Sequence, residues 1–377
     1  MRVFLLTFFA LYGGMNGYLY WKLIRGCVFG LTGRIVLAGF LLLMVCGPLL
    51  LRFLDRGGHF LSASILAWVV YPWMAVALWF LCVGVLGDIW NLSLRAVALW
   101  APSAKALIVP PKPVLAATAV VIVVLLTWGL IEACAIRGKE LTFTVPQLPP
   151  GTKPIRIAVL SDLHLGVTTG PWRFARAMRI IQSAAPDAII SLGDLLDSNN
   201  GNVESFVRRL AALNPPLGKY AIFGNHEMHS GPEESLEFHR LAGFQVLRGR
   251  SVQLVPGVRL AGLDDPAFFN NRREELAAEA AALAEGPDDY VILLKHRPEV
   301  TDAQVGRFML QLSGHTHGGQ FFPFLLITAN QFRYYTGLHP LDHGAAIYVS
   351  KGTGTWGPPL RVLAPPEVTL ITLLPTR

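Results

Sequence analysis

Four long stretches without a charged residue lie in the first third of this 377-residue chain. They run over Val3–Trp21, Ile35–Leu51, Phe60–Gly87 and Val114–Ile131. A helix of about 20 apolar residues is long enough to cross the hydrocarbon core of a bilayer. We therefore expect residues 1–139 to form an all-α transmembrane domain of four spans.

The composition agrees with a protein that lies partly in lipid. The mean hydropathy is +0.45, and 53% of the residues are hydrophobic whereas 15% are charged, which is too apolar for a purely soluble protein. The net charge of +7 comes from residues 1–150, which hold 11 Lys and Arg against 4 Asp and Glu, while residues 151–377 hold 21 of each sign. Because the second part is neutral, we expect no nucleic acid as a partner, and a nuclease is disfavoured.

The expected location is the cell (inner) membrane, with several passes through the bilayer. The short loops carry five Lys and Arg on one side of the spans and six on the other, so the positive-inside rule does not assign a side to the second part. The sequence does not indicate an oligomeric partner. All four cysteines, Cys27, Cys46, Cys82 and Cys134, precede residue 150, which leaves no disulfide or thiolate metal site in the second part.

Residues 140–152 are rich in proline and are predicted to be an extended linker, so that a second domain covers residues 153–377. Apolar runs there predict strands at 155–160, 188–192 and 220–223, alternating with helices at 172–183 and 203–213. The short apolar runs at 244–247, 252–255 and 258–263 predict antiparallel hairpins.

Polar clusters follow several of the predicted strands directly. They are Asp162-x-His164, Gly193-Asp194, Gly224-Asn225-His226-Glu227, His296 and Gly314-His315-x-His317. Ligands of open α/β sheets bind at the carboxyl ends of strands. Two imidazoles one residue apart, flanked by glycine, suit a loop that aims both rings at one metal ion.

The five clusters have the order and approximate spacing of calcineurin-like metallophosphoesterases, which residues 153–377 resemble. This resemblance implies an α/β fold, a β-sandwich of two mixed sheets flanked by helices, preceded here by the transmembrane domain. Gly318-Gly319-Gln320 and the tail at 352–359 resemble the branch of the family with a multi-span membrane anchor.

The resemblance also implies a site with two divalent metal ions about 3.5–4 Å apart, which activate water for in-line attack on phosphorus. Asp194 would bridge both ions, Asp162, His164 and His317 would complete the first site, and Asn225, His296 and His315 the second. His226 resembles the catalytic histidine, which with Asn225 binds the phosphate or protonates the leaving oxygen; alternatively, it supports a ligand from behind. Nitrogen and oxygen donors favour Mn, with Fe, Zn or Co as alternatives.

Three more polar residues have open roles. Asp197 is predicted to form a local turn or to accept a hydrogen bond behind the ligands. Glu227 either orients His226 or forms a structural salt bridge, and Arg333 is a candidate to clamp a phosphate.

The stretch Phe321–Ile327 is either a buried strand, which we favour, or a surface that takes up acyl chains. The predicted function is a membrane-integrated metallophosphoesterase whose metal-bound hydroxide hydrolyses a monoester, diester or pyrophosphate. The expected partners are the lipid bilayer and a phosphorylated lipid or lipid-linked substrate. The alternatives are a UDP-diacylglucosamine-type pyrophosphate hydrolase of lipid A synthesis and, outside the enzymes, a transporter or sensor with a phosphoesterase-like binding module.

Overall fold

The computed structural model describes residues 2–197, 203–286 and 288–376. The chain forms two compact units, Met1–Trp128 and Gly129–Arg377. The division lies inside the last long helix of the first unit and therefore before the predicted boundary. The end of that helix belongs to the second unit.

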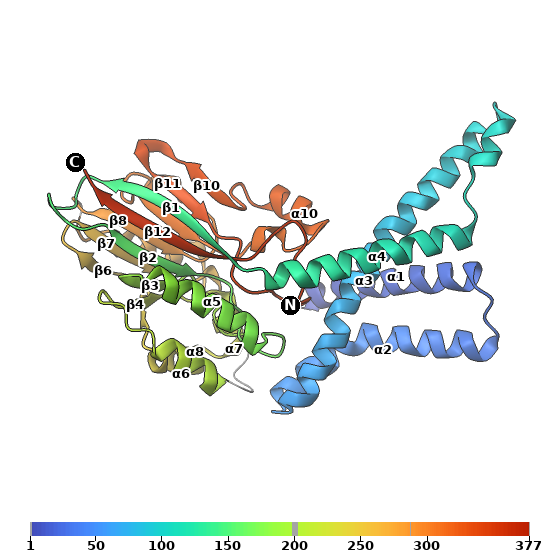
Figure 1. The fold of residues 1–377 in the computed structure, drawn as a ribbon, viewed down its shortest axis with the longest axis horizontal. Coiled ribbons are helices and arrows are strands. Elements are labelled where there is room, and N and C mark those ends of the chain that lie inside the picture. Colours follow the sequence, from blue (N-terminus) through green and yellow to red (C-terminus); the bar gives the residue numbers. More distant parts are fainter. Residues whose placement is uncertain (1, 198–202, 287, 377) are drawn as a thin grey trace. The chain divides into compact units, whose positions relative to one another are not determined.

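The first unit is all helical, as expected. It contains α1 (Arg2–Gly26), α2 (Leu31–Arg56), α3 (Phe60–Val97), a 3-10 turn (Pro102–Leu107) and most of α4 (Pro111–Cys134) (Figure 1). Among the described residues, α2, α3 and α4 are long and apolar enough to cross a membrane. Helix α1 is not among these three, so the fourth span remains a prediction.

Polar contacts join α1 to α3. The side chain of Asn16, which is buried in α1, accepts a hydrogen bond from the indole of Trp73 at 2.9 Å. The hydroxyl of Tyr18 donates to Asp88 at 2.6 Å, and Lys22 forms an ion pair with the same carboxylate. Because Asp88 lies past the predicted end of the third span, these contacts stabilise α3 in the segment where it extends to Val97.

The second unit is built on two six-stranded mixed sheets. The first has the order β1-β12-β2-β3-β4-β5 and the second β10-β11-β9-β8-β7-β6. The strands are β1 (Arg137–Val145), β2 (Ile155–Leu160), β3 (Ala188–Ser191), β4 (Lys219–Ala221), β5 (Gln245–Val246), β6 (Arg250–Val255), β7 (Val258–Leu263), β8 (Tyr290–Lys295), β9 (Leu310–Ser313), β10 (Gly337–Pro340), β11 (Ala346–Val349) and β12 (Glu367–Pro375).

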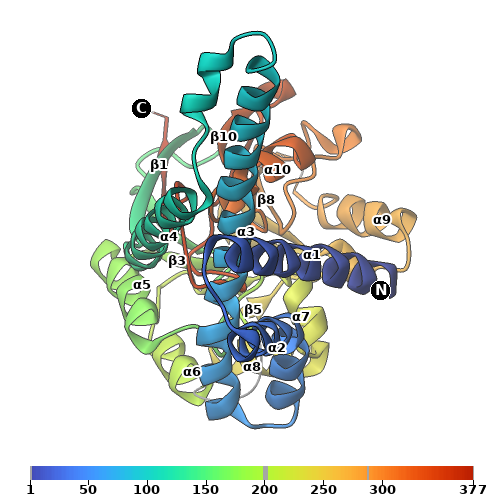
Figure 2. The ribbon, with the colours of Figure 1, turned by 90° about the vertical axis from the view of Figure 1, so that its right-hand side faces the viewer.

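Apolar side chains of both sheets form a buried core between them, with Ile157 and Ile190 from one sheet and Leu260 and Ile292 from the other. Helices cover the two outer faces: α5 and α9 lie on opposite sides of the unit (Figure 2). The helices are α5 (Pro171–Ala184), α6 (Val203–Ala211), α7 (Asn225–Ser230), α8 (Pro232–Leu241), α9 (Arg272–Ala282) and α10 (Phe324–Gln331). This is the predicted sandwich flanked by helices.

The predicted linker is wrong over much of its length. Strand β1 occupies 137–145 and pairs in parallel with β12 along nine residue pairs. Leu141, Phe143 and Val145 alternate with polar residues and contribute to the core between the sheets. This period of two is the signature of a strand with one buried face, and the prolines that follow it only mark its end.

Two other predictions are corrected at the edges of the sandwich. Strand β5 does not belong to a hairpin, because it pairs in parallel with β4 at the edge of the first sheet; the β6–β7 hairpin is antiparallel as expected. The favoured strand at 321–327 is also wrong. Phe321 forms an isolated bridge to Val362, and α10 begins at Phe324.

The role of β1 in the core can be tested by shortening one buried side chain. Val145→Ala removes two methyl groups from a fully buried position and should destabilise the second unit by about 2 kcal/mol, which lowers its melting temperature by about 5 °C. Thr144→Ala, at an exposed neighbouring position, is the control. Equal melting temperatures of both variants in detergent would contradict the assignment of β1 to the core.

Candidate metal centre

The predicted ligands come together where strands of both sheets end. Asp162 and His164 follow β2, Asp194 follows β3, and Asn225 begins the helix after β4. From the second sheet, His296 follows β8, and His315 and His317 follow β9. Carboxyl ends of neighbouring parallel strands meet at one edge, which explains how side chains 155 positions apart in sequence become neighbours.

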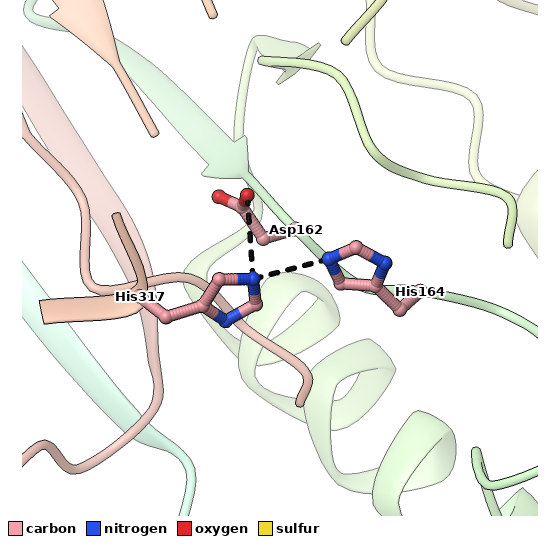
Figure 3. Close-up of side chains that lie close together, drawn as sticks. All are labelled: Asp162, His164 and His317. Carbon is pink, nitrogen blue, oxygen red and sulfur yellow. Dashed lines mark hydrogen bonds and ion pairs between the residues drawn. The ribbon is translucent and has the colours of Figure 1, made fainter. Parts of the chain in front are cut away.

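One group of possible ligand atoms consists of Asp162, His164 and His317 (Figure 3). The Nε2 atom of His317 lies 3.7 Å from Asp162 Oδ1 and 3.1 Å from His164 Nε2. All three side chains are buried, and their candidate ligand atoms lie within 4.8 Å of one another. Two imidazole nitrogens and a carboxylate oxygen therefore point toward a common position.

A second group consists of Asp194, His296 and His315. The Nε2 atom of His296 lies 3.2 Å from Asp194 Oδ2 and 3.2 Å from His315 Nδ1. The same Asp194 oxygen is 3.8 Å from His164 Nε2. Asp194 thus lies between the two groups, where a carboxylate can reach an ion in each.

Asn225 provides a test of whether the site suits a cation. Its carbonyl oxygen, Oδ1, is buried and accepts no hydrogen bond from the described part of the chain. An unpaired buried carbonyl costs free energy, and a divalent cation would remove that cost. The donor set of carboxylate, amide oxygen and imidazole nitrogen, without sulfur, fits such an ion.

Electrostatics favour the metal-binding protonation state at three predicted ligands, whereas at His296 burial is outweighed by the carboxylates of Asp194 and Asp162, which raise the pKa to about 10. Burial and the imidazole of His296 together lower the pKa of His315 to about 3. Burial and the Arg361 guanidinium hold the pKa of His317 well below its usual range. Burial opposes ionisation of Asp194, yet the imidazoles of His296 and His226 hold its pKa well below the ordinary value.

Backbone strain is concentrated at this edge. Five of the predicted ligands have left-handed backbones, with φ between 49° and 70°: Asp162, His164, Asp194, His315 and His317. Each such residue costs of order 1–3 kcal/mol unless its surroundings hold it in place. Strain of this kind clusters at functional sites because it aims side chains in directions that regular structure does not allow.

Glycines let the loops approach closely enough to form the cluster. A Cβ atom at Gly193 would lie 2.4 Å from the backbone nitrogen of Gly224, and one at Gly224 would lie 2.2 Å from Asp194 Oδ1. Neither position can accept a side chain without moving a ligand loop. The glycines in the predicted motifs are therefore explained by contact between loops.

Glu227 has a role that neither sequence-based interpretation anticipated. Its buried carboxylate accepts hydrogen bonds from the backbone N–H groups of Asp194 at 2.9 Å, Leu195 at 2.8 Å and Leu196 at 3.3 Å, and from that of Gly224 at 2.8 Å. No cation forms an ion pair with it in the described residues. Glu227 thus joins the loop of Asp194 to the loop of Asn225.

Asp197 accepts a hydrogen bond behind the ligands, which was one of its two predicted roles. Its Oδ1 atom lies 2.5 Å from His226 Nδ1 and 3.5 Å from His164 Nδ1. Burial alone would lower the pKa of His226, but the carboxylates of Asp197 and Asp194 raise it to about 9. The contact fixes the ring, so that the other nitrogen of His226 is available to a bound phosphate.

Arg361 is a site residue that the sequence did not single out. Its guanidinium is fully buried and donates to the carbonyl oxygens of His317 at 2.8 Å and Lys351 at 2.7 Å, while Nη2 lies 3.1 Å from His317 Nδ1. The arginine thereby ties the metal-binding loop to the segment before β12. The one sequence signal that could have indicated Arg361 is its position as a lone arginine in an apolar run.

Comparison with known proteins agrees with this geometry. Residues 155–319 match the family model described as calcineurin-like phosphoesterase. A protein of Aquifex aeolicus named "Uncharacterized metallophosphoesterase" is 39% identical over 253 residues, which are 67% of this chain and 97% of that protein. The "Transmembrane protein with metallophosphoesterase domain" of Danio rerio is 29% identical over 67% of this chain and 61% of its own length.

Among solved structures, a dimetal phosphatase from Danio rerio has a TM-score of 0.38 and 12% identity, over 53% of this chain and 88% of its own. The family match and the Aquifex relative define the class, a metal-dependent phosphoester hydrolase. The chain belongs to the calcineurin-like metallophosphoesterases, a family with dinuclear metal centres, and its apolar helices associate it with a membrane.

The function of Glu227 is tested by replacing one carboxylate oxygen with an amide. Glu227→Gln places an NH₂ group against backbone N–H donors and should lower both metal content and turnover at least tenfold, since each unsatisfied buried donor costs about 1–3 kcal/mol. Metal content is measured by mass spectrometry and turnover with p-nitrophenyl phosphate. Glu233→Gln, at an exposed position of α8, is the matched control. Wild-type metal content and turnover of Glu227→Gln would contradict the proposed role of Glu227.

His226 and Asp194 should separate catalysis from metal binding. His226→Ala is expected to keep both metal ions and to lose about 10²–10⁴ in turnover, the range for loss of a general acid or base. Asp194→Asn should lose metal and turnover together. If His226→Ala also lost its metal, His226 would be a ligand and the assignment would be wrong.

Proposed function

We propose that this protein is a membrane-integrated, dinuclear-metal phosphoesterase that hydrolyses a phosphate ester or pyrophosphate of a membrane lipid or lipid-linked substrate. Asp162, His164 and His317 would hold one ion, Asn225, His296 and His315 the other, and Asp194 both. When bound, the ions neutralise the phosphate and lower the pKa of a water molecule that attacks phosphorus. Mixed nitrogen and oxygen donors support Mn, with Fe, Zn or Co as alternatives.

His226 supplies the proton chemistry of the chain itself. The hydrogen bond to Asp197 occupies Nδ1, which leaves Nε2 to contact a phosphate oxygen or to protonate the leaving oxygen. A raised pKa keeps a proton on the imidazole at neutral pH, as a general acid requires. The side chain is 16% exposed, so that a substrate can reach it.

The observation that carries the lipid assignment is the apolar surface of α10. Phe322, just before the helix, is 40% exposed, and within the helix Phe324, Leu326 and Ile327 are 41%, 58% and 56% exposed. No residue of α10 is buried. Contiguous exposed apolar side chains on a folded unit mark a surface that binds another apolar phase.

Helix α10 lies directly on the metal-binding loop. A Cβ atom at Gly319 would lie 2.2 Å from the Cα atom of Leu325. At the other end of the helix, the ring of Phe332 packs edge-on against His315, with 5.7 Å between ring centroids. An acyl chain on this surface would therefore lie beside the phosphate site.

The end of a candidate span is fixed to the same region. The end of α4 belongs to the second unit. There, Gly129 O accepts a hydrogen bond from Arg361 N at 2.9 Å, and the Glu132 side chain accepts one from Ala364 N at 2.9 Å. Between these two, Val362 N donates to Gln320 O at 3.0 Å. Residues 361–364 thus contact both the end of α4, where the chain enters the second unit, and Gln320 in the segment that leads into α10. This supports a substrate drawn from the bilayer.

The lipid assignment is tested by making this surface polar. Leu326→Asn combined with Ile327→Asn should raise KM for phosphatidic acid in vesicles at least tenfold, because two partly exposed apolar side chains contribute about 1.5 kcal/mol or more to lipid contact. KM for soluble p-nitrophenyl phosphate should change less than twofold. Leu236→Asn, a 41% exposed leucine of α8, is the control. Equal changes of KM for both substrates would contradict the assignment.

A further inference from the structure

A pocket of about 450 Å³ opens beside the metal cluster. Residues directly after the predicted ligand His296 form one wall, and residues at and after the end of α10 form the other. The predicted ligand His315 also lines the pocket. Its volume falls in the range of small-molecule sites, about 300–1,000 Å³. Its lining includes Arg272, Arg297, Glu299, Phe332, Arg333 and Tyr334.

Two of the three arginines in the pocket are already neutralised. Arg297 forms two hydrogen bonds to the buried carboxylate of Asp265, at 2.8 and 3.0 Å. Arg272 forms ion pairs with Glu275 and, at 3.6 Å, with Glu299. These pairs fix the walls of the pocket, which is lined by three arginines and by the two carboxylates of Glu299 and Asp302.

Arg333 differs from both. Within the described residues, no carboxylate lies within 4.0 Å of its guanidinium. The group stacks over the ring of Tyr334 at 5.1 Å from the centroid, which restrains the side chain and leaves its N–H donors free. A planar guanidinium with free donors matches the geometry of phosphate oxygens.

The backbone beside Arg333 is anchored to the metal centre. The preceding residue, Phe332, packs on the ring of His315, so the arginine directly follows a residue that contacts a predicted ligand. A group bound by Arg333 would therefore sit close to a phosphate bound at the cluster.

The larger pocket elsewhere in the unit does not suit an anion. It measures about 640 Å³ and lies between α6 and α8. Glu204, Glu233, Glu234 and Glu237 line it, and it includes no residue of the cluster. Its four glutamates outnumber its one arginine, Arg208, so the lining would repel a phosphate, whereas arginines outnumber carboxylates in the pocket beside the predicted ligands.

We propose that the pocket between the His296 and α10 segments binds a second phosphoryl group of the substrate, with Arg333 as the specificity-determining residue. This inference rests on the proposed phosphoesterase function and narrows its substrates to lipids with two phosphates, such as a lipid diphosphate or a lipid with a phosphorylated headgroup. The cleaved phosphate lies at the metal cluster, and the second one lies on Arg333.

The test compares a diphosphonate with a monophosphonate. Binding of methylenediphosphonate and of methylphosphonate to the Mn-loaded full-length protein is measured by calorimetry, and their inhibition of p-nitrophenyl phosphate hydrolysis is measured in parallel. The wild type should bind the diphosphonate at least tenfold more tightly. Arg333→Gln should weaken diphosphonate binding about tenfold and methylphosphonate binding less than threefold, whereas Arg333→Lys should restore part of the loss. Arg179→Gln, at an exposed position of α5, should behave as the wild type.

Three outcomes are distinguishable. If the protein hydrolyses p-nitrophenyl phosphate but Arg333→Gln and Arg179→Gln bind the diphosphonate equally well, the second phosphate site is refuted and the phosphoesterase function stands. If Arg333→Gln weakens both phosphonates equally, the residue has no role in choosing diphosphates, which also refutes the inference. If neither phosphate ester nor lipid is hydrolysed, the proposed function itself fails.

Discussion

The site depends on one buried carboxylate that binds backbone. Glu227 accepts four N–H groups from the loops after β3 and β4, and these loops carry Asp194 and Asn225. Without this interaction the N–H groups would be unpaired in a region that water does not reach, which is a costly arrangement. The predicted ligands Asp194 and Asn225 are thus positioned by the carboxylate of a neighbouring residue, Glu227.

The same region contains buried polar groups that the described part of the chain does not fully satisfy. Burial raises the pKa of Asp162, and the amide oxygen of Asn225 accepts no hydrogen bond within the described residues. Imidazole nitrogens of His164 and His317 face each other at 3.1 Å. Each of these features is unfavourable alone, and each becomes favourable when a cation lies between the groups. The folded chain therefore places these groups where binding of cations stabilises them.

The sequence predicted the centre of the fold better than its edges. Strands β3 and β8 are mainly apolar and buried at every position, and β2 is buried except at Arg156; such runs are easy to recognise. Strand β1 was missed because three prolines directly after it dominated the interpretation of its segment, although its alternation was visible. Strand β5 was given the wrong partner because two residues carry too little pattern to define one.

At the site, too, compact sequence motifs were easier to interpret than contacts between distant segments. Gly-Asn-His-Glu and Gly-His-Thr-His are compact patterns, and their histidines, His226, His315 and His317, each belong to a group of possible ligand atoms that includes Asp162 or Asp194. The contact of Arg361 with His317 joins segments distant in sequence, so no local pattern revealed it. A role of Asp197 behind the ligands was predicted, but its partner His226 was not. The composition of 321–327 correctly indicated an apolar segment. It did not decide whether that segment is a buried strand or an exposed surface. The exposed helix α10 resolves that choice.

The central claim is that seven side chains hold two metal ions that share Asp194. Anomalous X-ray diffraction from crystals of the full-length protein loaded with Mn tests it directly. The account predicts two peaks about 3.5–4 Å apart, one beside Asp162 and the other beside His296, with Asp194 in contact with both. A single peak, or two peaks of which only one contacts Asp194, would contradict it.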